Sequence, residues 1–237
     1  MPCPIDLNST ARRHNIPIMP RTRIKFCGIT SPADAAAAAD AGADAIGLVL
    51  GANSSRRITI EQASQIMAAL PPMITPVGLF ADSYAAEVTR IVQILHLTHI
   101  QLHGNEPPEF LGQLPNVKIL KAIRVEKISF ADTLKRWKAT RVSGLLLETP
   151  GTTGGSGIEN DWETIIAAKQ SDLLDGLPPI IAAGGLRPDN VAAVIHRLRP
   201  FAVDVSSGIE SAPGIKSVEK MAAFASAVRA ADETGTS

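Results

Sequence analysis

The chain has 237 residues, of which 45% are apolar, and its formal net charge at pH 7 is zero. This length and composition suit one globular domain, and the charge balance gives no reason to expect a nucleic acid or an anionic membrane as partner. Two cysteines form neither a disulfide framework nor a metal signature, and no apolar run is long enough to span a bilayer. We therefore expect a cytoplasmic monomer or homodimer that binds a small molecule.

The chain begins with a segment that differs from the rest. Residues 1–22 are rich in proline, arginine and polar residues and lack the apolar stretch of a secretory signal. We expect a disordered N-terminal extension here, a single folded domain over residues 23–232, and a short disordered tail at 233–237.

From residue 23 onward, short apolar runs alternate with longer helical segments. The runs lack a strict polar–apolar alternation, which is typical of strands that are buried on both faces of a parallel sheet. The predicted strands are 23–27, 44–50, 74–80, 98–102, 117–122, 143–148, 179–183 and 201–205.

Helix signals lie between these strands. Ser31 is a candidate N-cap with Pro32 at the first helical position, Gly42 stands where that helix should stop, and Thr59 begins the next helix in the same way. Clear helices also follow within residues 187–200 and 218–231. Eight strands, each followed by a helix, predict an α/β fold of the (β/α)8 TIM-barrel type. An open doubly wound sheet is the alternative, but it usually has a glycine-rich turn after its first strand.

Active sites of such barrels lie at the carboxyl ends of the strands, where this chain places several polar residues. Cys27 ends the first strand; on its own it is a small core residue, because free cysteine is often buried. Arg56, after the second strand, suits a substrate carboxylate, although loop arginines are more often merely solvated. His103, after the fourth, is a candidate base or a histidine satisfied by a backbone partner. Asp204 lies within an apolar strand, which is costly unless it is paired or used.

Two glycine-rich stretches follow the last two strands. Gly184 and Gly185 follow the seventh, and Ser206 and Ser207 follow the eighth. Each stretch alone is compatible with a tight turn. Together they occupy the two places where this fold binds phosphate, so they predict a phosphate site. A third cluster, residues 152–157, suggests a lid over the ligand. The histidines show no ligand spacing, and we expect no metal and no cofactor.

Seven segments in chain order resemble one family, phosphoribosylanthranilate isomerase of tryptophan biosynthesis. They are "IKFCGIT", "AGADAIGLVL…SSRRIT", "VGLF", "IQLHGNE", "GGSG…DW", "AAGGLRPDNV" and "RPFAVDVSSGIE". The resemblance implies a cofactor-free Amadori rearrangement of N-(5′-phosphoribosyl)anthranilate, an aminoaldose, to an aminoketose.

The resemblance also implies roles for individual residues. Cys27 would be the general base that removes the proton from the sugar C2, with nearby cations or backbone amides favouring its thiolate. Glu148 matches the position of the family's general acid, which is usually an aspartate. Arg56, or its neighbour Arg57, would hold the anthranilate carboxylate, and Asp204 would contact the amine side. The phosphate would be bound by Gly184, Gly185, Ser206 and Ser207.

Two other functions remain open from the sequence. Because Glu148 replaces the usual aspartate, the chain is alternatively a phosphate-binding barrel with impaired catalysis that acts as a binding module. The synthase that acts next in the pathway is a third candidate. We find no lysine at the end of the first three strands suited to its ring closure, since Lys25 lies inside the first strand.

Overall fold

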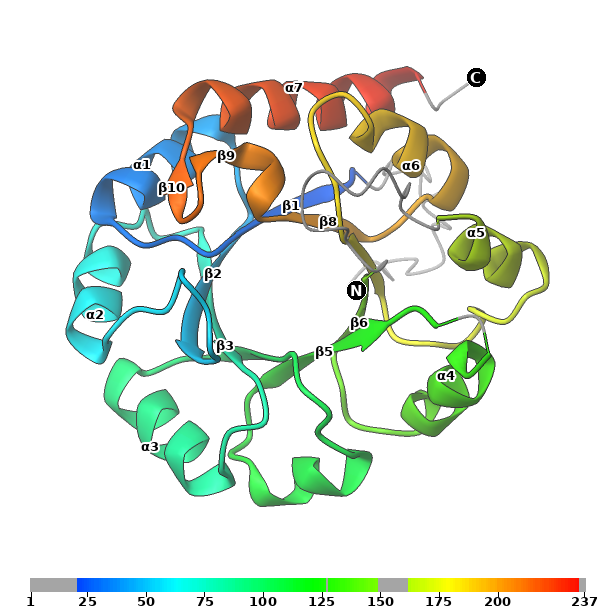
Figure 1. Cartoon of the computed structure of the whole chain (residues 1–237), viewed down its shortest axis with the longest axis horizontal. Coiled ribbons are helices and arrows are strands. Elements are labelled where there is room, and N and C mark those ends of the chain that lie inside the picture. Colours follow the sequence, from blue (N-terminus) through cyan, green and yellow to red (C-terminus); the bar gives the residue numbers. More distant parts are fainter. Residues whose placement is uncertain (1–20, 127, 149–161, 235–237) are drawn as a thin grey trace, which may run out of the picture.

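The computed structural model describes residues 21–126, 128–148 and 162–234. Eight parallel strands pair in chain order and close into a barrel, with β1 between β2 and β8. Figure 1 looks down this barrel and shows helices around the ring of strands, with α7 packed beside α1 and α6. The predicted barrel is confirmed, and strand ends differ from the predicted ones by two residues at most. The strands are β1 Arg23–Cys27, β2 Ala45–Gly51, β3 Thr75–Phe80, β4 His99–Leu102, β5 Lys118–Arg124, β6 Gly144–Glu148, β7 Ile180–Ala183 and β8 Ala202–Val205.

The helices begin and end where local signals place them. The Ser31 side chain accepts a hydrogen bond from the Asp34 N–H at 3.1 Å, and Gly42 ends α1 with a left-handed φ of 96°. Thr59 and Gln62 form a reciprocal capping box at the start of α2. None of the helices in the described ranges is long and apolar enough to cross a membrane. The helices are α1 Pro32–Ala41, α2 Ile60–Ala68, α3 Ala85–Leu95, α4 Phe130–Lys138, α5 Trp162–Gln170, α6 Val191–Leu198 and α7 Val218–Thr234.

One connection departs from the predicted pattern of a helix after every strand. Between β4 and β5 the chain forms only a short 3₁₀ helix, η1 (Pro108–Gln113). Pro107 precedes it, Pro108 is its first residue and Pro115 follows it. Proline disfavours the helical conformation in the residue before it and lacks an N–H to donate, so this segment is held to a single tight turn.

The apolar core has three parts, one outside the barrel and two inside it. Large side chains such as Phe26 and Phe224 pack between the strands and the surrounding helices, with their rings 6.0 Å apart. Inside the barrel the buried apolar residues are smaller: Ala122, Leu146, Ile181, Ala183 and Ala202. Above them, towards the carboxyl end, Cys27, Val49 and Leu79 form a third small cluster.

The two ends of the described chain meet at the amino-terminal end of the barrel. The Thr22 backbone N–H and hydroxyl both donate to the Asp232 carboxylate at 2.7 Å, and Arg21 pairs with Asp44. Most of the predicted extension, residues 1–20, and most of the predicted tail, residues 235–237, lie outside the described residues. The contacts of Arg21 and Thr22 show that the fold begins before residue 23, and α7 continues to Thr234.

After β8 the chain adds a small hairpin. A 3₁₀ turn, η2 (Ser207–Ile209), leads into β9 (Glu210–Ala212), which pairs with β10 (Ile215–Lys216) in an antiparallel ladder. The hairpin lies over the carboxyl end of β1 and β8 (Figure 1). It therefore brings Glu210 and Lys216 to the end of the barrel where the predicted site residues lie.

Candidate active site

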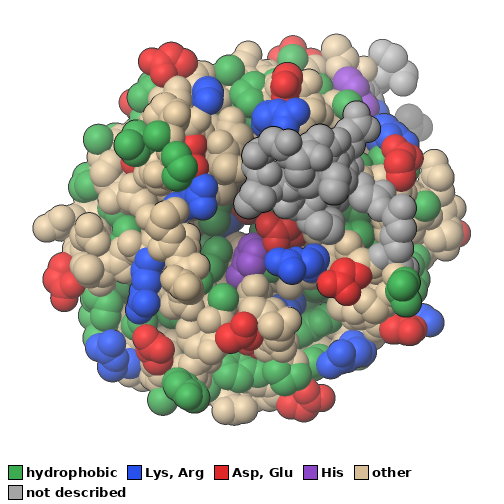
Figure 2. All heavy atoms as spheres, in the orientation of Figure 1, with side chains coloured by type: hydrophobic (Ala, Val, Ile, Leu, Met, Phe, Trp, Pro, Cys, Tyr) green, Lys and Arg blue, Asp and Glu red, His purple; other side chains and the backbone are tan. Residues whose placement is uncertain are grey.

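A pocket of about 550 Å³ opens at the carboxyl ends of the strands. In the space-filling view down the barrel, basic, acidic and histidine side chains gather around the hollow at its centre (Figure 2). The pocket brings together the residues that the sequence singled out for catalysis or binding, with Arg56 but not its alternative Arg57. These residues are Cys27, Arg56, Glu148, Gly184, Gly185, Asp204, Ser206 and Ser207.

Cys27 lies beside a buried ion pair. It follows Lys25 by two residues in β1, so both side chains point to the same face of the strand, the barrel interior. The Lys25 Nζ atom lies 2.7 Å from Asp204 Oδ1 on the neighbouring β8, and both side chains are nearly inaccessible to solvent. Gly47 of β2 leaves room for this arrangement, since a Cβ there would lie 2.6 Å from Cys27 Sγ and 3.1 Å from Lys25 Nζ.

The protonation of Cys27 differs from the sequence-based expectation. Burial raises the pKa of the thiol and the charge of Asp204 raises it further, while Lys25 and Lys216 lower it; the net result is a raised pKa. For Lys25, burial acts to lower the pKa, but Asp204 and Cys27 outweigh it and the ammonium is retained. The expected thiolate is therefore not the favoured form at neutral pH, because desolvation of the sulfur outweighs the cations around it.

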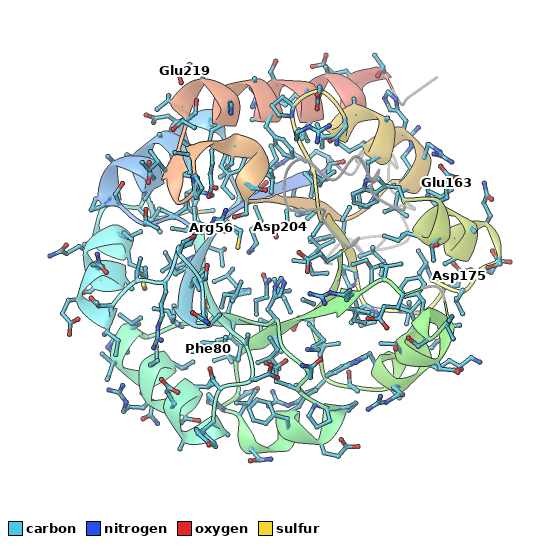
Figure 3. The ribbon with its side chains drawn as sticks, in the orientation of Figure 1. Arg56, Phe80, Glu163, Asp175, Asp204 and Glu219 are labelled. Carbon is cyan, nitrogen blue, oxygen red and sulfur yellow. The ribbon has the colours of Figure 1, made fainter. Side chains whose placement is uncertain are left out.

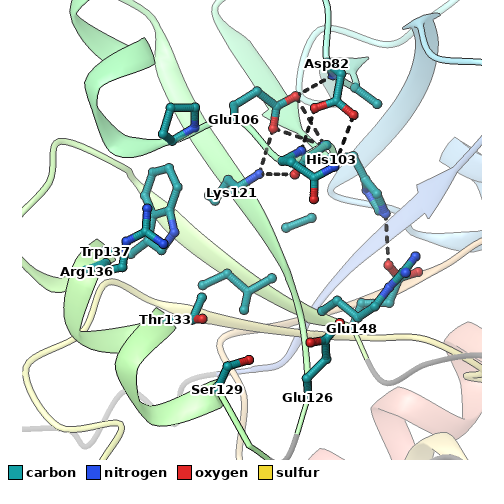
Figure 4. A pocket seen from close by; sticks show the side chains of 17 residues that line it. Asp82, His103, Glu106, Lys121, Glu126, Ser129, Thr133, Arg136, Trp137 and Glu148 are labelled. Carbon is teal, nitrogen blue, oxygen red and sulfur yellow. Dashed lines mark hydrogen bonds and ion pairs between the residues drawn. The ribbon is translucent and has the colours of Figure 1, made fainter.

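Glu148 ends β6 and is paired with His103. His103 Nε2 lies 3.0 Å from Glu148 Oε2 (Figure 4). On the other side of the ring, His103 Nδ1 lies 2.7 Å from the amide nitrogen of Gln101. Burial acts to raise the pKa of the Glu148 carboxyl. The hydrogen bond from His103 and the positive charges of His103, Arg124 and Lys25 lower it, and the lowering prevails. The ring of His103 is thus held by two side chains rather than by the backbone partner considered above.

Arg56 enters the pocket in a two-pronged ion pair. Its Nε and Nη2 atoms donate to the two Glu210 carboxylate oxygens at 2.6 and 2.7 Å. Its aliphatic stem crosses over Gly28, where a Cβ would lie 2.5 Å from Arg56 Cδ; Gly28 also has a φ of +75°, which favours glycine. Arg57 is exposed and is not among the residues that line the pocket. The geometry therefore favours Arg56 over Arg57 as the arginine of the site.

The predicted phosphate site is a close meeting of the loops after β7 and β8. Gly184 and Gly185 have φ values of 89° and 61°, which turn the backbone sharply after β7. On the other side, a Cβ on Gly208 would lie only 1.9 Å from the Leu186 carbonyl oxygen, so only glycine allows the two loops to approach this closely. Ser206 and Ser207 stand at the start of η2, in the same wall of the pocket.

A second pocket, of about 540 Å³, adjoins the first across His103 and Glu148 (Figure 4). Beside it lies a buried ion pair, in which Lys121 Nζ lies 2.7 Å from Glu106 Oε2 and 2.6 Å from the Gly104 carbonyl oxygen. The Glu106 carboxylate also accepts backbone N–H groups of Asp82 and Gly104. These bonds tie the loop after β4 to β5 and to the loop after β3.

Three residues of the pocket region had no role assigned from the sequence: Lys25, Glu210 and Lys216. Lys25 had a usable signal, because a lysine two residues before Cys27 in a buried strand must face the same side and needs a partner. Glu210 stands in the segment "VSSGIE", but nothing in that segment points to Arg56. Lys216 gave no signal, since its approach to Glu210, at 2.9 Å, depends on the hairpin.

Two sequence-based expectations concern other parts of the site. The glycine cluster at residues 152–157, expected to form a lid, lies outside the described residues. Within the described residues, no group of three or more His, Cys, Asp or Glu side chains is placed to hold a metal ion.

Comparison with known proteins gives a consistent result. Residues 24–227 match the family model described as N-(5′-phosphoribosyl)anthranilate (PRA) isomerase. The N-(5′-phosphoribosyl)anthranilate isomerase of Pseudomonas fluorescens is 43% identical over 220 residues, which are 91% of this chain and 100% of the relative.

Solved structures agree with the sequence relatives. The phosphoribosyl anthranilate isomerase of Thermus thermophilus superposes with a TM-score of 0.75 at 37% identity, over 88% of this chain and 99% of the other. A second isomerase structure, in complex with reduced 1-(o-carboxyphenylamino)-1-deoxyribulose 5-phosphate, gives a TM-score of 0.77 at 31% identity over 88% and 99%.

Proposed function

Because the chain belongs to the N-(5′-phosphoribosyl)anthranilate isomerase family, we propose that its pocket at the mouth of the barrel performs this isomerisation with Cys27 as base and Glu148 as acid. The chain is an isomerase of tryptophan biosynthesis that converts the aminoaldose N-(5′-phosphoribosyl)anthranilate to the corresponding aminoketose. One observation carries the assignment of roles: Cys27 and Glu148 border the same pocket as Arg56 and the paired glycine loops.

The two charged ends of the substrate suit two features of the pocket. The phosphate fits the loops after β7 and β8, where Gly184, Gly185, Ser206 and Ser207 offer backbone N–H groups and hydroxyls. The anthranilate carboxylate fits Arg56, whose Nη1 edge is left over from the bond with Glu210. We assign the substrate amine to Asp204, which lines the pocket next to Cys27.

The chemistry needs an acid and a base on different atoms. Glu148 donates a proton to the ring oxygen, and the C1–O bond of the furanose breaks to give a protonated imine. Cys27 then removes the proton from C2, and its electron pair moves toward the imine to form an enolamine. Tautomerisation of the enolamine, with protonation at C1, gives the aminoketose, so no external reductant or oxidant is consumed.

The pKa shifts make the productive form a minority of the molecules. The pKa of Cys27 is raised and that of Glu148 is lowered, whereas catalysis needs a thiolate and a protonated carboxyl. Each unit of separation between the two pKa values costs about 1.4 kcal/mol. The anionic phosphate and carboxylate of the substrate favour the protonated form of Glu148, but by the same repulsion they disfavour the Cys27 thiolate.

Gln101 provides a further route to a protonated Glu148. Gln101 is fully buried, and its Oε1 atom has no hydrogen-bond partner within the described residues. With the amide turned end for end, Oε1 accepts a hydrogen bond from the His103 Nδ1–H. The neutral imidazole then presents Nε2 as an acceptor, which leaves the shared proton on Glu148.

The other two functions gain no support. The relatives and solved structures described above carry the name of the isomerase, so a binding module with impaired catalysis is not favoured. For the synthase, Lys25 does face the barrel interior, but it is buried and already paired with Asp204.

Turnover of the aminoaldose, followed by the loss of anthranilate fluorescence, tests the assignment. Cys27→Ser retains size but loses the ionisable thiol, and Glu148→Gln retains shape but cannot donate the proton. We expect each to lower kcat by roughly 10²–10⁴-fold while the melting temperature stays within a few degrees. Full activity of Cys27→Ser would make the thiol a core residue and move the base elsewhere, first to His103.

Glu148→Asp decides whether the longer side chain is an adaptation. The carboxylate of Glu148 reaches His103 at 3.0 Å, and shortening the stem breaks this contact. A displacement of about 1 Å can cost on the order of a hundredfold in rate, so we expect the aspartate variant to be slower. A faster variant would show that glutamate is a tolerated defect.

Compartment, assembly and domain limits complete the proposal. We place the protein in the cytoplasm, because a catalytic thiol needs a reducing compartment. Its ligand is a small phosphosugar, and we expect a monomer or homodimer, which sedimentation will decide. We propose one barrel domain over the predicted residues 23–232, extended by two residues at each end to include Arg21 and Thr22 and the end of α7 at Thr234.

A further inference from the structure

The Glu210 carboxylate lies between two cations at the edge of the pocket. It accepts two hydrogen bonds from Arg56 and one from Lys216 Nζ, at 2.9 Å. The side chains of Glu210 and Lys216 are only 5% and 0% exposed, respectively, so water contributes little to holding them. We call Arg56, Glu210 and Lys216 the charged trio.

The trio connects two parts of the site that come from distant segments of the chain. Arg56 follows β2, whereas Glu210 and Lys216 come from the hairpin after β8. Lys216 Nζ also donates to the Ser206 carbonyl oxygen at 3.1 Å, within the predicted phosphate loop. The carboxylate-binding arginine is therefore tied, through two ion pairs, to the backbone that borders the phosphate.

The side-on bond to Glu210 fixes the direction of the guanidinium. With Nε and Nη2 engaged, the planar group cannot rotate, and its remaining N–H groups on Nη1 keep one direction. In Figure 3, Arg56 and Asp204 both lie beside the central opening of the barrel. Gly28 allows the arginine stem to take this path, because any side chain there would collide with it.

We propose that Glu210 is a positioning residue that sets selectivity for a carboxylated aryl substituent, by orienting Arg56 at a fixed distance from the phosphate loop. This inference rests on the proposed function, since it assumes that Arg56 receives the anthranilate carboxylate. It adds a residue that touches no substrate atom and acts through the arginine. Lys216 keeps Glu210 ionised and fixes it to Ser206.

Two ligands that differ only by the carboxylate test the proposal. The first is reduced 1-(o-carboxyphenylamino)-1-deoxyribulose 5-phosphate, and the second is the same compound without the ring carboxylate. We expect the wild type to bind the first roughly 10–100-fold more tightly in calorimetry, as one charge-assisted contact allows. In Glu210→Gln we expect this ratio to fall to about threefold or less.

Matched controls separate orientation from general damage. Glu219→Gln changes an exposed glutamate at the rim of the molecule (Figure 3) and should keep the wild-type ratio. Glu210→Gln should not weaken binding of inorganic phosphate, because it removes a negative charge from the trio, and it should raise KM more than it lowers kcat. A wild-type ratio in Glu210→Gln, or an equal loss for both ligands and phosphate, would overturn the proposal.

A second variant covers the case in which Glu210→Gln does not fold. Arg56→Lys keeps the positive charge beside Glu210 but lacks the planar fork, and we expect the same loss of the ratio. Arg57→Lys, one residue away and exposed, is its control. Because these readouts are binding constants, they test the role of Glu210 separately from catalysis. If the wild type shows no turnover but still binds the carboxylated ligand more tightly, only the proposed function is contradicted.

Discussion

Two buried lysine–glutamate pairs lie at the carboxyl end of this barrel, and they differ in charge balance. Lys121 and Glu106 form a one-to-one pair whose remaining hydrogen bonds go to the backbone. In the charged trio, one carboxylate faces two cations, so one positive charge is left over next to the pocket. Both Cys27 and the predicted phosphate loop are close enough to be affected by it.

This difference separates a structural pair from a binding one. A neutral pair that is saturated by backbone groups has nothing left to offer a ligand, and its value lies in holding two loops to β5. A trio with excess positive charge is unfavourable on its own, because the cost of desolvating the extra cation is offset only when an anion binds. Its presence therefore indicates where an anionic substrate belongs.

Breaking the neutral pair should give the largest effect on stability. Glu106→Gln leaves the Lys121 ammonium buried without a counter-charge, and such a loss costs about 3–5 kcal/mol in the free energy of unfolding. Urea denaturation measures it, with Glu219→Gln as control. Ligand affinity of the folded fraction should be unchanged; a variant that is as stable as wild type would show that Lys121 finds water or another acceptor.

Converting the trio into a pair should affect binding more than stability. Lys216→Met leaves Arg56 and Glu210 as a neutral pair and removes the excess charge near Ser206. We expect affinity for inorganic phosphate to fall about tenfold, or about 1.4 kcal/mol. Titration calorimetry measures this change. Unaltered phosphate binding would mean that the loop backbone alone supplies the attraction.

The pH profile of kcat/KM should reflect the shifted pKa values of Glu148 and Cys27. Activity requires protonated Glu148 and ionised Cys27. Because the pKa of the acid lies below that of the base, a rise in pH between the two values lowers the first fraction by the same factor as it raises the second, so their product is constant. We therefore expect a broad plateau that spans neutrality, falling as pH drops through the pKa of Glu148 and as it rises through that of Cys27. A narrow maximum near pH 7 would contradict this.

The variants sharpen the test of the upper limb. Lys216 lowers the pKa of Cys27, so Lys216→Met should move the upper limb to higher pH by a fraction of a unit. Glu106→Gln should leave that limb in place, because the Lys121–Glu106 pair is not among the groups that act on Cys27.

The smallest effect should come from the beginning of the chain. Deleting residues 1–20 retains Arg21 and Thr22, whose bonds to Asp44 and Asp232 anchor the first strand. We expect the free energy of unfolding to change by less than about 0.5 kcal/mol, as for surface changes in general, and turnover to stay the same. Thr22→Val, which removes the hydroxyl bond to Asp232, is a useful comparison, and a larger effect of the deletion would contradict the proposed domain boundary.

The sequence by itself determined the barrel and the identity of the residues around its mouth. Short apolar runs with caps and stops between them predict β/α units, and in such a barrel the ends of the strands always meet. For this reason Cys27, Glu148, Arg56 and the two glycine loops were predictable as one site. The resemblance of their motifs to one family gave each residue its expected role.

Only the tertiary structure decided how these groups are charged and oriented. The protonation of Cys27 depends on how far burial exceeds the effect of Lys25, and that of Glu148 depends on the reach of its side chain to His103. The partner of Arg56 lies 154 positions away along the chain, in a hairpin whose sequence carries no sign of it. Strand order follows from local patterns, whereas desolvation and ion pairing depend on distances between segments that meet only in the folded protein.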